Sequence, residues 1–246
     1  MQESIETKPE EALAPGLYLV ATPIGNLEDI TYRAVRVLKS CNRILAEDTR
    51  HSRILLDHYG IRKPLGPYHD FNKERTTGGY LQHLRDGEAV ALICDAGTPG
   101  IADPAFNLVK AALAEDIVVY SIPGPSALLT ALTASGLPTD RFSFENFPPK
   151  KSAQRLRKLE TLKAKWPEDA DHAPTLCFFV APYQLINFLA EITQIFGPEF
   201  YVVVARELTK NFEEFRRGPI GEISAHYDKH TPRGEFVVLF HPQNKR

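Results

Sequence analysis

Residues 88–104 read EAVALICDAGTPGIADP, which is an apolar run, a loop of small residues and the start of a helix. The aliphatic run Glu88–Cys94 predicts a buried strand. Pro104 suits the first turn of a helix, where a missing backbone N–H costs no hydrogen bond. A strand, a loop and a helix in this order form the repeating unit of an α/β fold.

The same order repeats on both sides of this stretch. Leu17–Thr22, Arg43–Glu47 and Ile117–Ile122 predict further strands, and the segments between them predict amphipathic helices. One helix is expected at Lys73–Arg85, and another is expected to be capped by Asp29. Because strands that alternate with helices pair in parallel, the first half of the chain predicts a parallel sheet covered by helices.

The pattern changes between residues 140 and 150. Phe142–Phe147 is rich in aromatic residues, and Pro148–Lys151 predicts a hinge. Beyond it, strands are predicted at Thr175–Val180, Tyr201–Ala205 and Glu235–His241. The expected organisation is a flexible tail at 1–15, an N-terminal α/β lobe at 16–138 and a C-terminal α/β lobe at 139–246.

The composition is that of a globular protein. Of 246 residues, 43% are hydrophobic, and the net charge of −2 excludes a chain that is basic over its whole surface. The three cysteines, Cys41, Cys94 and Cys177, lie in or beside apolar runs without metal-ligand spacing. We therefore expect buried, reduced thiols, no zinc site and an intracellular, reducing compartment, the cytoplasm. No apolar run reaches the roughly 18 residues of a membrane span, so no membrane partner is expected.

Three loops at predicted strand ends consist mainly of small residues and prolines. The chain has no Gly-x-Gly-x-x-Gly after a strand and no P-loop, which excludes the usual dinucleotide and nucleoside triphosphate sites. Ligands of α/β sheets bind at the carboxyl ends of strands, where glycine admits a ligand and proline orders the loop in advance. Each loop alone is also compatible with an ordinary turn, but together they predict a site for a small polar ligand. The loops are Ala21–Asn26, Asp95–Pro104 and Ile122–Ala127.

Two aspartates in the second loop differ in what the sequence predicts for them. Asp103 can cap the helix that begins at Pro104. Asp95 follows a buried strand directly and has no such structural role in the sequence, so it is the main candidate for ligand binding.

Six ordered segments resemble the family of 16S ribosomal RNA cytidine 2′-O-ribose methyltransferases, the small-subunit methyltransferases I, within the tetrapyrrole methylase superfamily. One such segment is a weak indication, but six in the family's order are specific, and they cover nearly the whole chain. They are TPIGNLEDIT at 22–31, AEDTR at 46–50, DAGTPGIADP at 95–104, PGPSA at 123–127, GLPTDRFSFENF at 136–147 and ARELTK at 205–210.

The resemblance implies an α/β fold of two tetrapyrrole-methylase-like lobes, each a mixed sheet flanked by helices, with S-adenosylmethionine between them. It implies a homodimer, no metal, and as substrate the 2′-hydroxyl of one cytidine, expected to be cytidine 1402, in the 16S RNA of the 30S subunit. It also implies a set of residues that contact the cofactor. They are Pro23, Asp95, Gly97, Thr98, Pro99, Ile101, Ser126, Ala127, Phe179, Ala205 and Glu207.

Glu47, Asp48 and Arg50 are the candidate catalytic residues on the acceptor side. Two carboxylates and an arginine at a strand end can orient a sugar, hold a phosphate and assist a weak nucleophile. The alternative is that Asp48 caps the following helix and pairs with Arg50 on the surface. His69 and Asp70 are second-rank candidates.

Residues 150–165 contain seven Lys or Arg residues against the single acid Glu160. Such a stretch in a chain of slightly negative charge predicts a surface that follows RNA phosphates. A solvated helix without a ligand is the alternative. The candidate RNA contacts are Lys150, Lys151, Arg155, Arg157 and Lys158.

Departures from the family pattern leave two other functions open. The family's FYExPHRL is FFVAPYQL here, so a carboxylate is replaced by Val180 and a His-Arg pair by Tyr183 and Gln184. One alternative is a methylase of a tetrapyrrole or another small molecule. The other is an RNA-binding assembly factor that retains the cofactor without turnover.

Overall fold

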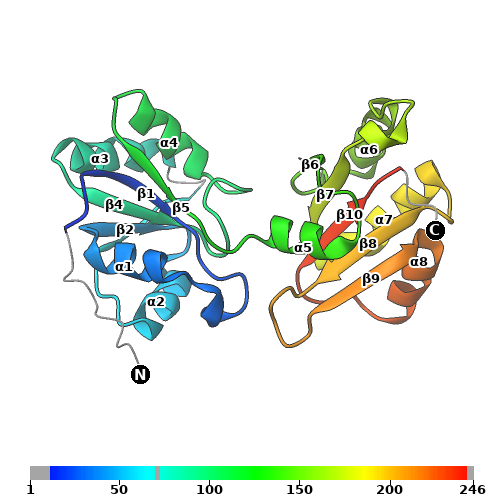
Figure 1. Ribbon diagram of the computed structural model, residues 1–246, viewed down its shortest axis with the longest axis horizontal. Helices are drawn as coiled ribbons and strands as arrows, with labels where there is room; N and C mark the ends of the chain where they lie inside the picture. The colour runs from blue at the N-terminus through cyan, green and yellow to red at the C-terminus, as the bar shows by residue number, and fades with distance from the viewer. Residues whose placement is uncertain (1–11, 70–72, 243–246) are drawn as a thin grey trace, which may run out of the picture. The chain divides into compact units, whose positions relative to one another are not determined.

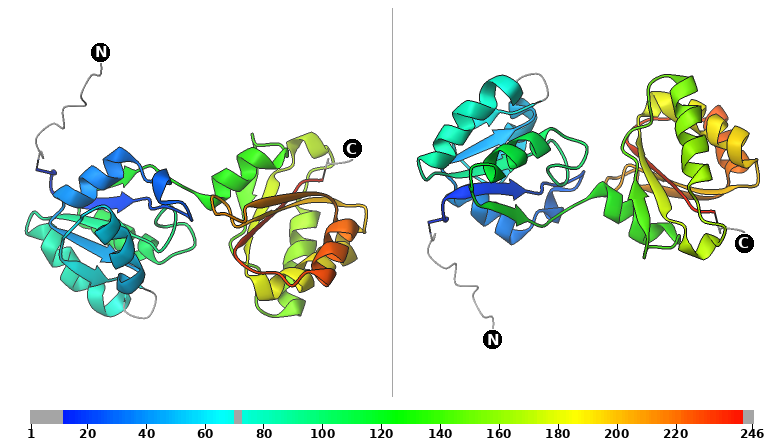
Figure 2. Two further views of the ribbon diagram at one scale, coloured as in Figure 1. Left: turned by 90° about the horizontal axis from the view of Figure 1, so that it is seen from below. Right: turned by 90° about the horizontal axis from the view of Figure 1, so that it is seen from above.

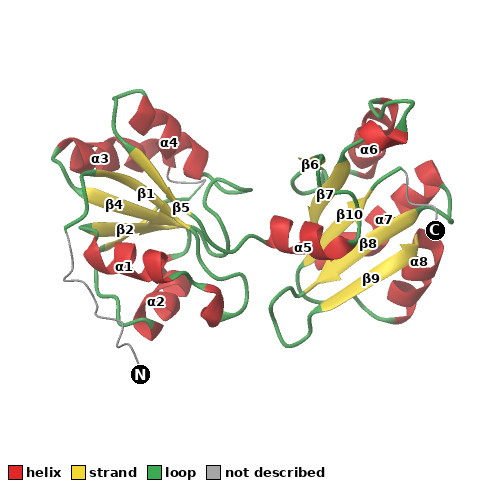
Figure 3. Cartoon of the chain, in the orientation of Figure 1, coloured by secondary structure: helices red, strands yellow, loops and turns green. Residues whose placement is uncertain are grey.

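The computed structural model describes residues 12–69 and 73–242, which form two compact units that divide between residues 126 and 127. Each unit has one five-stranded sheet with helices packed on it (Figures 1 and 3), so the predicted α/β fold is confirmed. Most of the predicted tail, residues 1–11, lies outside the described residues. In the described part of the chain, no helix has the length and apolar character needed to span a bilayer.

The sheet of the first unit has the strand order β3-β2-β4-β1-β5, and all its pairs are parallel. The parallel sheet predicted from the strand–helix alternation is confirmed, whereas the mixed sheet implied for this lobe is wrong. The strands are β1 (Gly16–Val20), β2 (Arg43–Ala46), β3 (Leu65–Pro67), β4 (Ala89–Ile93) and β5 (Val119–Ile122), and the helices are α1 (Tyr32–Ser40), α2 (Thr49–His58), α3 (Lys73–Arg85) and α4 (Ala105–Leu113).

Different helices cover the two faces of this sheet. Leu38 of α1 and Leu56 of α2 pack in one core cluster, and Leu84 of α3 and Leu108 of α4 pack in the other. Figure 1 shows α1 and α2 below the strands and α3 and α4 above them. In parallel βα units the loops that follow the strands meet at one edge of the sheet, which we call the carboxyl edge.

Helix α1 begins later than predicted. Asn26 accepts a hydrogen bond from the backbone N–H of Glu28 and starts a short 3-10 turn that includes Asp29. The chain enters α1 only at Tyr32, where the Thr31 hydroxyl accepts from the N–H of Ala34 at 3.1 Å. Asp29 was expected to cap this helix, and that prediction is wrong because the turn already includes Asp29.

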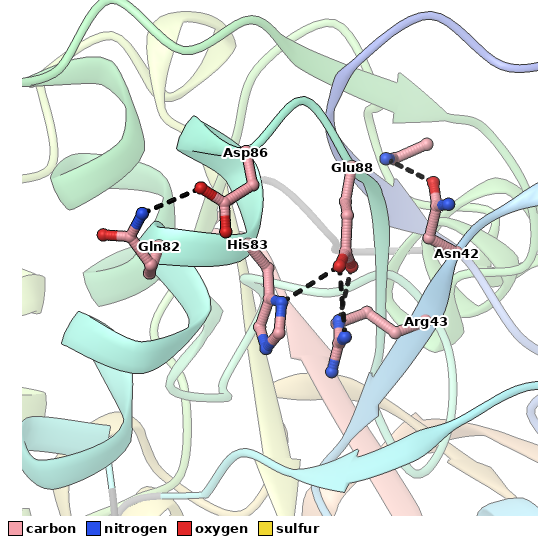
Figure 4. A network of polar contacts seen from close by, with 7 residues as sticks. Asn42, Arg43, Gln82, His83, Asp86 and Glu88 are labelled. Atoms are coloured by element: carbon pink, nitrogen blue, oxygen red, sulfur yellow. Dashed lines mark hydrogen bonds and ion pairs between the residues drawn. The ribbon is translucent and has the colours of Figure 1, made fainter.

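Polar contacts hold β2 beside β4 at the opposite, amino edge of the sheet (Figure 4). Arg43 Nε lies 2.7 Å from Glu88 Oε2, and His83 Nδ1 lies 3.0 Å from Glu88 Oε1. The Asn42 side chain accepts from the N–H of Ala89 at 2.8 Å. These contacts fix the start of both strands whose ends form the candidate site.

The second unit has a mixed sheet, as the resemblance implies. Its order is β6-β7-β10-β8-β9, with β6 parallel to β7 and the other pairs antiparallel. The strands are β6 (Phe142–Phe144), β7 (Thr175–Val180), β8 (Tyr201–Arg206), β9 (Glu214–Pro219) and β10 (Phe236–Phe240), and the helices are α5 (Ala127–Ser135), α6 (Ser152–Ala164), α7 (Pro182–Phe196) and α8 (Ile220–Lys229).

Helix α5 packs on β7, β8 and β10, on the face opposite α6, α7 and α8 (Figure 2). These contacts assign α5 to the second unit. The predicted N-terminal lobe at 16–138 includes this helix, because its Pro-Gly-Pro lead-in resembles the start of a further βα unit. The chain therefore enters the second unit before the aromatic segment at β6.

Three strands, β3, β6 and β9, were not predicted. Each lies at the edge of its sheet. β3 and β6 have three residues each, and β9 has the polar sequence EFRRGP. A strand with one neighbour needs no continuous apolar run, so hydrophobic periodicity does not reveal it.

All three cysteines are buried and none forms a disulfide, as predicted. Burial raises the pKa of the thiol to about 11 for Cys41 and to about 12 for Cys177. It also raises the pKa of Cys94, which lies directly before the loop at Asp95. Thiols with such pKa values stay protonated at neutral pH and are poor nucleophiles.

Candidate cofactor and RNA site

Hydrogen bonds join the three predicted loops at the carboxyl edge of the first sheet. Thr22, after β1, and Gly97, after β4, each donate a backbone N–H to the other's carbonyl, at 2.9 and 3.0 Å. The Thr98 hydroxyl donates to the carbonyl of Pro125, after β5, at 3.0 Å. The loops are thus ordered by contacts within the unit itself.

Small residues permit this close packing. Gly97 has a φ of 84°, a left-handed conformation that favours glycine. A Cβ added to Gly124 would lie 2.9 Å from the Cβ of Ala21, so a larger residue would push the first and third loops apart. The packing of the loops therefore explains why glycine occupies positions 97 and 124, whether or not a ligand binds.

Asp103 fixes the far end of the second loop. One carboxylate oxygen accepts from the N–H of Ala105 at 2.8 Å, and the other accepts from the N–H of Gly100 at 2.7 Å. Asp103 was expected to cap a helix begun by Pro104, but the N-cap residue is Pro104 itself, and Asp103 holds the N–H of the first helical residue, Ala105, from one position earlier. Between these points Ala102 has a φ of 68°, and Ile101 exposes 41% of its surface.

Asp95 has a structural partner that the sequence does not reveal. Its Oδ1 accepts a hydrogen bond from the backbone N–H of Asp48, at 3.0 Å. This contact joins the loop after β4 to the end of β2, the neighbouring strand. Asp95 is exposed, so its carboxylate is also accessible to a ligand.

Asp48 caps α2, and the alternative interpretation of this residue is confirmed. Its Oδ1 accepts from the N–H of Arg50 at 2.8 Å, and its Oδ2 pairs with the Arg50 guanidinium at 2.8 Å. The side-chain hydrogen bond from Arg50 is the largest cause that holds the pKa of Asp48 far below its usual range. Asp48 is therefore an anion with little basicity, which argues against a role as general base.

The other acceptor-side candidates differ from one another in exposure and in position along the chain. Glu47 is half-buried between β2 and Asp48, and the side chain of Arg50 is 90% exposed. His69 is half-buried beyond β3. Asp70 lies outside the described residues. Glu47 and Arg50 thus lie one and four residues beyond Ala46, the last buried residue of β2, on either side of the cap.

The cofactor candidates of the first unit differ in what they expose. Asp95 and Ile101 present exposed side chains, and Thr98 and Ser126 are half-buried, as is Ala127 at the start of the second unit. The remaining three are buried and shape the loops from within. They are Pro23, Gly97 and Pro99.

Two residues of the second unit that were predicted to contact the cofactor have a packing role in the structure. Ala205 is fully buried in β8, which pairs with strands on both sides. Phe179 of β7 is half-buried, and its ring contacts Phe144 edge-to-face with centroids 4.8 Å apart. Phe147, 52% exposed, also contacts the Phe179 ring edge-to-face, with centroids 5.7 Å apart.

Glu207 holds the end of β8 to the start of β10. Its Oε1 accepts from Lys210 Nζ and from the N–H of Glu235, each at 2.9 Å. Burial acts to raise the pKa of Glu207, but these two hydrogen bonds, together with the positive charges of Lys210 and Arg206, lower the pKa overall. A Cβ on Gly234 would overlap the Glu207 carboxylate. Gly234 and Glu235 lie far from Glu207 in sequence, so no local pattern predicts this role.

The basic segment at α6 is only partly a free surface. Lys150, Lys151 and Arg157 are exposed. Lys158 donates to the Glu145 carbonyl at 2.6 Å, and its Nζ lies 3.2 Å from the Glu145 carboxylate. Its side chain is 29% exposed, so it is mainly a structural residue.

Arg155 is a buried structural residue, and its predicted role as an RNA contact is wrong. Its side chain is 6% exposed and forms two hydrogen bonds of 2.6 and 2.7 Å with Glu191 of α7. It also donates to the carbonyls of Pro149 and Lys150. The guanidinium is occupied, because it fixes α6 to α7 and to the turn before α6.

The altered FFVAPYQL segment lies at the end of β7 and the start of α7. Val180 is buried in the core, and Gln184 is buried in the first turn of the helix. Tyr183 is 74% exposed. Of the three substituted positions, only Tyr183 presents a side chain that a partner can reach.

Comparisons with known proteins agree with this architecture. Residues 16–224 match the family described as Tetrapyrrole (Corrin/Porphyrin) Methylases. The chain is 47% identical over 235 residues to the ribosomal RNA small subunit methyltransferase I of Mesorhizobium japonicum, with 95% of this chain and 78% of that protein covered. The protein of the same name from Pseudomonas aeruginosa is 46% identical over 225 residues, with 91% and 77% covered.

Among solved structures, the uroporphyrin-III C-methyltransferase of Thermus thermophilus, complexed with S-adenyl homocysteine, is similar in fold. The TM-score is 0.61 at 19% identity, with 92% of this chain and 97% of that chain covered. At this identity the likeness indicates the fold alone.

Proposed function

The chain belongs to the tetrapyrrole methylase family, and within it to the ribosomal RNA small subunit methyltransferases I, and on this premise we propose that it is an S-adenosylmethionine-dependent methyltransferase of small-subunit ribosomal RNA. The finer part of the proposal is that it methylates the 2′-hydroxyl of cytidine 1402 in the 30S subunit, as a homodimer in the cytoplasm.

One observation supports this proposal most directly, the pre-assembled carboxyl edge of the first sheet. The Thr22–Gly97 and Thr98–Pro125 contacts order the loops before any ligand arrives, so binding requires little further ordering. S-adenosylmethionine, when bound, supplies a methyl group on a positively charged sulfur.

The exposed residues of the edge fit this cofactor chemically. The Asp95 carboxylate can accept hydrogen bonds from sugar hydroxyls, and Ile101 offers an apolar surface to a base or a thioether. Thr98 and Ser126 add hydroxyl groups beside them. We propose that these four residues hold the cofactor, with the buried Pro23, Gly97 and Pro99 shaping the loops. The second-unit candidates Ala127, Phe179, Ala205 and Glu207 remain part of the proposed cofactor site. Ala205 and Glu207 contribute to it chiefly by fixing the backbone around them.

We assign separate roles to the acceptor-side residues. Arg50, with its exposed guanidinium, is proposed to hold an RNA phosphate, and Asp48 positions it through the cap and the ion pair. Glu47 is proposed to orient the ribose hydroxyl or take its proton. Alignment of the acceptor oxygen in a site that excludes water contributes several kcal/mol to such a transfer.

The test is transfer of labelled methyl groups from S-adenosylmethionine to 30S subunits, followed by mass mapping of the RNA. We expect one 2′-O-methylated cytidine with the protein and none without it, and a large loss of turnover in Glu47→Gln at unchanged cofactor affinity. Parallel incubations with a uroporphyrin-type tetrapyrrole test the small-molecule alternative. Binding of cofactor and RNA without transfer would instead indicate the assembly factor.

A further inference from the structure

A second strongly basic region lies in the first unit, on the helices that flank the acceptor-side residues. Residues 32–63 contain eight Lys or Arg residues and three Asp or Glu residues, although the whole chain has 29 basic and 31 acidic residues. Strand β2 divides this region, so the charges do not form one continuous run in the sequence.

The fold brings these charges to one surface. Both α1 and α2 bury their apolar sides in the same core cluster and turn the other side outward. Arg33 and Arg36 are exposed on α1, and Arg50 and Arg53 are exposed on α2. We call these four residues the α1–α2 basic face.

Two observations connect α1 with α2 and place α2 directly after the acceptor-side residues. The Tyr59 hydroxyl, at the end of α2, donates to the carbonyl of Leu27, just before α1. Figure 1 accordingly shows the two helices side by side on one face of the sheet. Arg50 and Arg53 lie in the first turns of α2, directly after Glu47 and Asp48.

The arginines of this face are available for a partner. Arg50 pairs with Asp48 through one edge of its guanidinium and remains 90% exposed. Within the described ranges, no salt bridge engages Arg33, Arg36 or Arg53. Exposed arginines that are not neutralised by a carboxylate attract phosphate groups, which their planar fork binds through two hydrogen bonds.

The helices on the other face of the same sheet, α3 and α4, carry four basic residues and one acid, so the other acids of this part of the chain lie in its turns and loops. Residues 73–116, which form α3, β4 and α4, contain four Lys or Arg residues and seven Asp or Glu residues. Two of these, Arg85 and Glu115, neutralise each other at 2.6 Å.

We propose that the α1–α2 basic face binds phosphates of the substrate RNA that flank the reactive nucleotide and leads the strand to Glu47 and Arg50. This inference rests on the proposed function for the identity of the RNA. The first residue of α1, Tyr32, is 93% exposed beside Arg33 and Arg36. An exposed aromatic ring beside arginines stacks on unpaired bases, so Tyr32 is assigned to a base next to the bound phosphates.

The experiment compares two double variants with the same change in charge. Arg36→Glu with Arg53→Glu alters the α1–α2 basic face, and Arg75→Glu with Lys110→Glu alters exposed residues of α3 and α4 on the other face. Equilibrium binding to 30S subunits is measured from about 50 to 200 mM salt, where phosphate contacts are strongly weakened. Thermal melting and cofactor calorimetry verify that both variants fold and bind S-adenosylmethionine as the wild type does.

We expect the first variant to bind RNA at least about tenfold more weakly at 100 mM salt, with a salt slope reduced by about one to two, and the second to stay within about twofold of the wild type. Tyr32→Ala should weaken binding several-fold without changing the salt slope, because it removes stacking and no charge. Tyr32→Phe should restore binding.

Equal losses in the two double variants, or no loss in the first, would overturn the inference, as would a wild type that binds no RNA. Salt-sensitive binding of the wild type to anionic lipid vesicles in place of RNA would also overturn it. Methyl transfer is scored separately. If the wild type transfers methyl groups and Arg36→Glu with Arg53→Glu binds RNA normally, only this inference fails. If the wild type transfers none but loses RNA binding through this variant, the surface stands and the proposed activity fails.

Discussion

The carboxylate of Asp95 accepts a hydrogen bond from the backbone N–H of Asp48, and this 3.0 Å contact joins the ends of two neighbouring strands. The loop proposed to bind the cofactor and the segment proposed to bind the acceptor therefore share a fixed point. A displacement of a reacting group by about 1 Å can slow a transfer reaction about a hundredfold. The contact thus bears on alignment as well as on binding.

Asp95→Ala should lower the affinity for S-adenosylmethionine at least about tenfold, because it removes both an exposed carboxylate and the fixed point on β2. Asp95→Asn keeps an acceptor oxygen for the Asp48 N–H and should lose less. Calorimetry measures both affinities. The melting temperature should change little, since one exposed hydrogen bond contributes about 1 kcal/mol. Full affinity in Asp95→Ala would remove Asp95 from the cofactor site.

Lys150→Glu combined with Lys151→Glu should weaken methylation of 30S subunits and leave the cofactor affinity unchanged. Both lysines are exposed before α6, and a reversal of two charges repels RNA phosphates. Lys229→Glu, an exposed position of α8 outside the basic segment 150–165, is the control for a general effect of charge. A parallel loss of cofactor binding would show that these lysines affect the fold of the site and not the RNA.

Arg155→Ala should destabilise the protein by about 3–5 kcal/mol, because it leaves Glu191 buried without its partner. Replacement of both residues by leucine should cost less, since no unpaired charge then remains in the interior. Urea unfolding measures each free energy. The exposed Arg157→Ala is the matched control, with an expected change within about 0.5 kcal/mol. An unchanged stability in Arg155→Ala would contradict the buried pair.

The contact of Glu88 with Arg43 should make stability depend on pH. Hydrogen bonding by Arg43 is the largest cause that holds the pKa of Glu88 below its usual value, and His83 adds a second hydrogen bond. A folded-state pKa that is lowered stabilises the protein above the unfolded-state pKa of about 4.3, and this contribution disappears as the pH falls through the folded-state pKa.

Glu88→Gln should therefore reduce the free energy of unfolding at pH 7, and its difference from the wild type should shrink below about pH 4. Urea unfolding at several pH values measures this difference. The exposed Glu222→Gln on α8 controls for a change of net charge alone. A difference that stays constant down to pH 3 would show that the Glu88 ion pair contributes nothing.

The parts of the fold that were predicted from sequence are those in which local pattern and tertiary structure agree. β4 is buried on both faces, and such a strand is a continuous apolar run that can be recognised without knowledge of its neighbours. β9 is the opposite case. Its polar residues Glu214, Arg216 and Arg217 are tolerated because the strand has one neighbour. The strand can therefore be recognised only when its pairing with β8 is known.

The candidate site shows the same division. The loop at Asp95 was predicted because all its unusual residues are adjacent in sequence. Arg155 was assigned to the wrong role because its partner Glu191 lies 36 residues away on another helix. The α1–α2 basic face was missed because Arg36 and Arg53 come from helices separated by a strand, so no single window of sequence contains the surface.

The burial of Cys41, Cys94 and Cys177 has a practical use. Since these are all the cysteines of the chain and their thiols stay protonated at neutral pH, maleimide reagents should leave the native protein unlabelled. A single cysteine introduced at an exposed position such as Lys110 would then be the one reactive thiol. A fluorophore attached there would report complex formation with ribosomal subunits in real time, on an unaltered background.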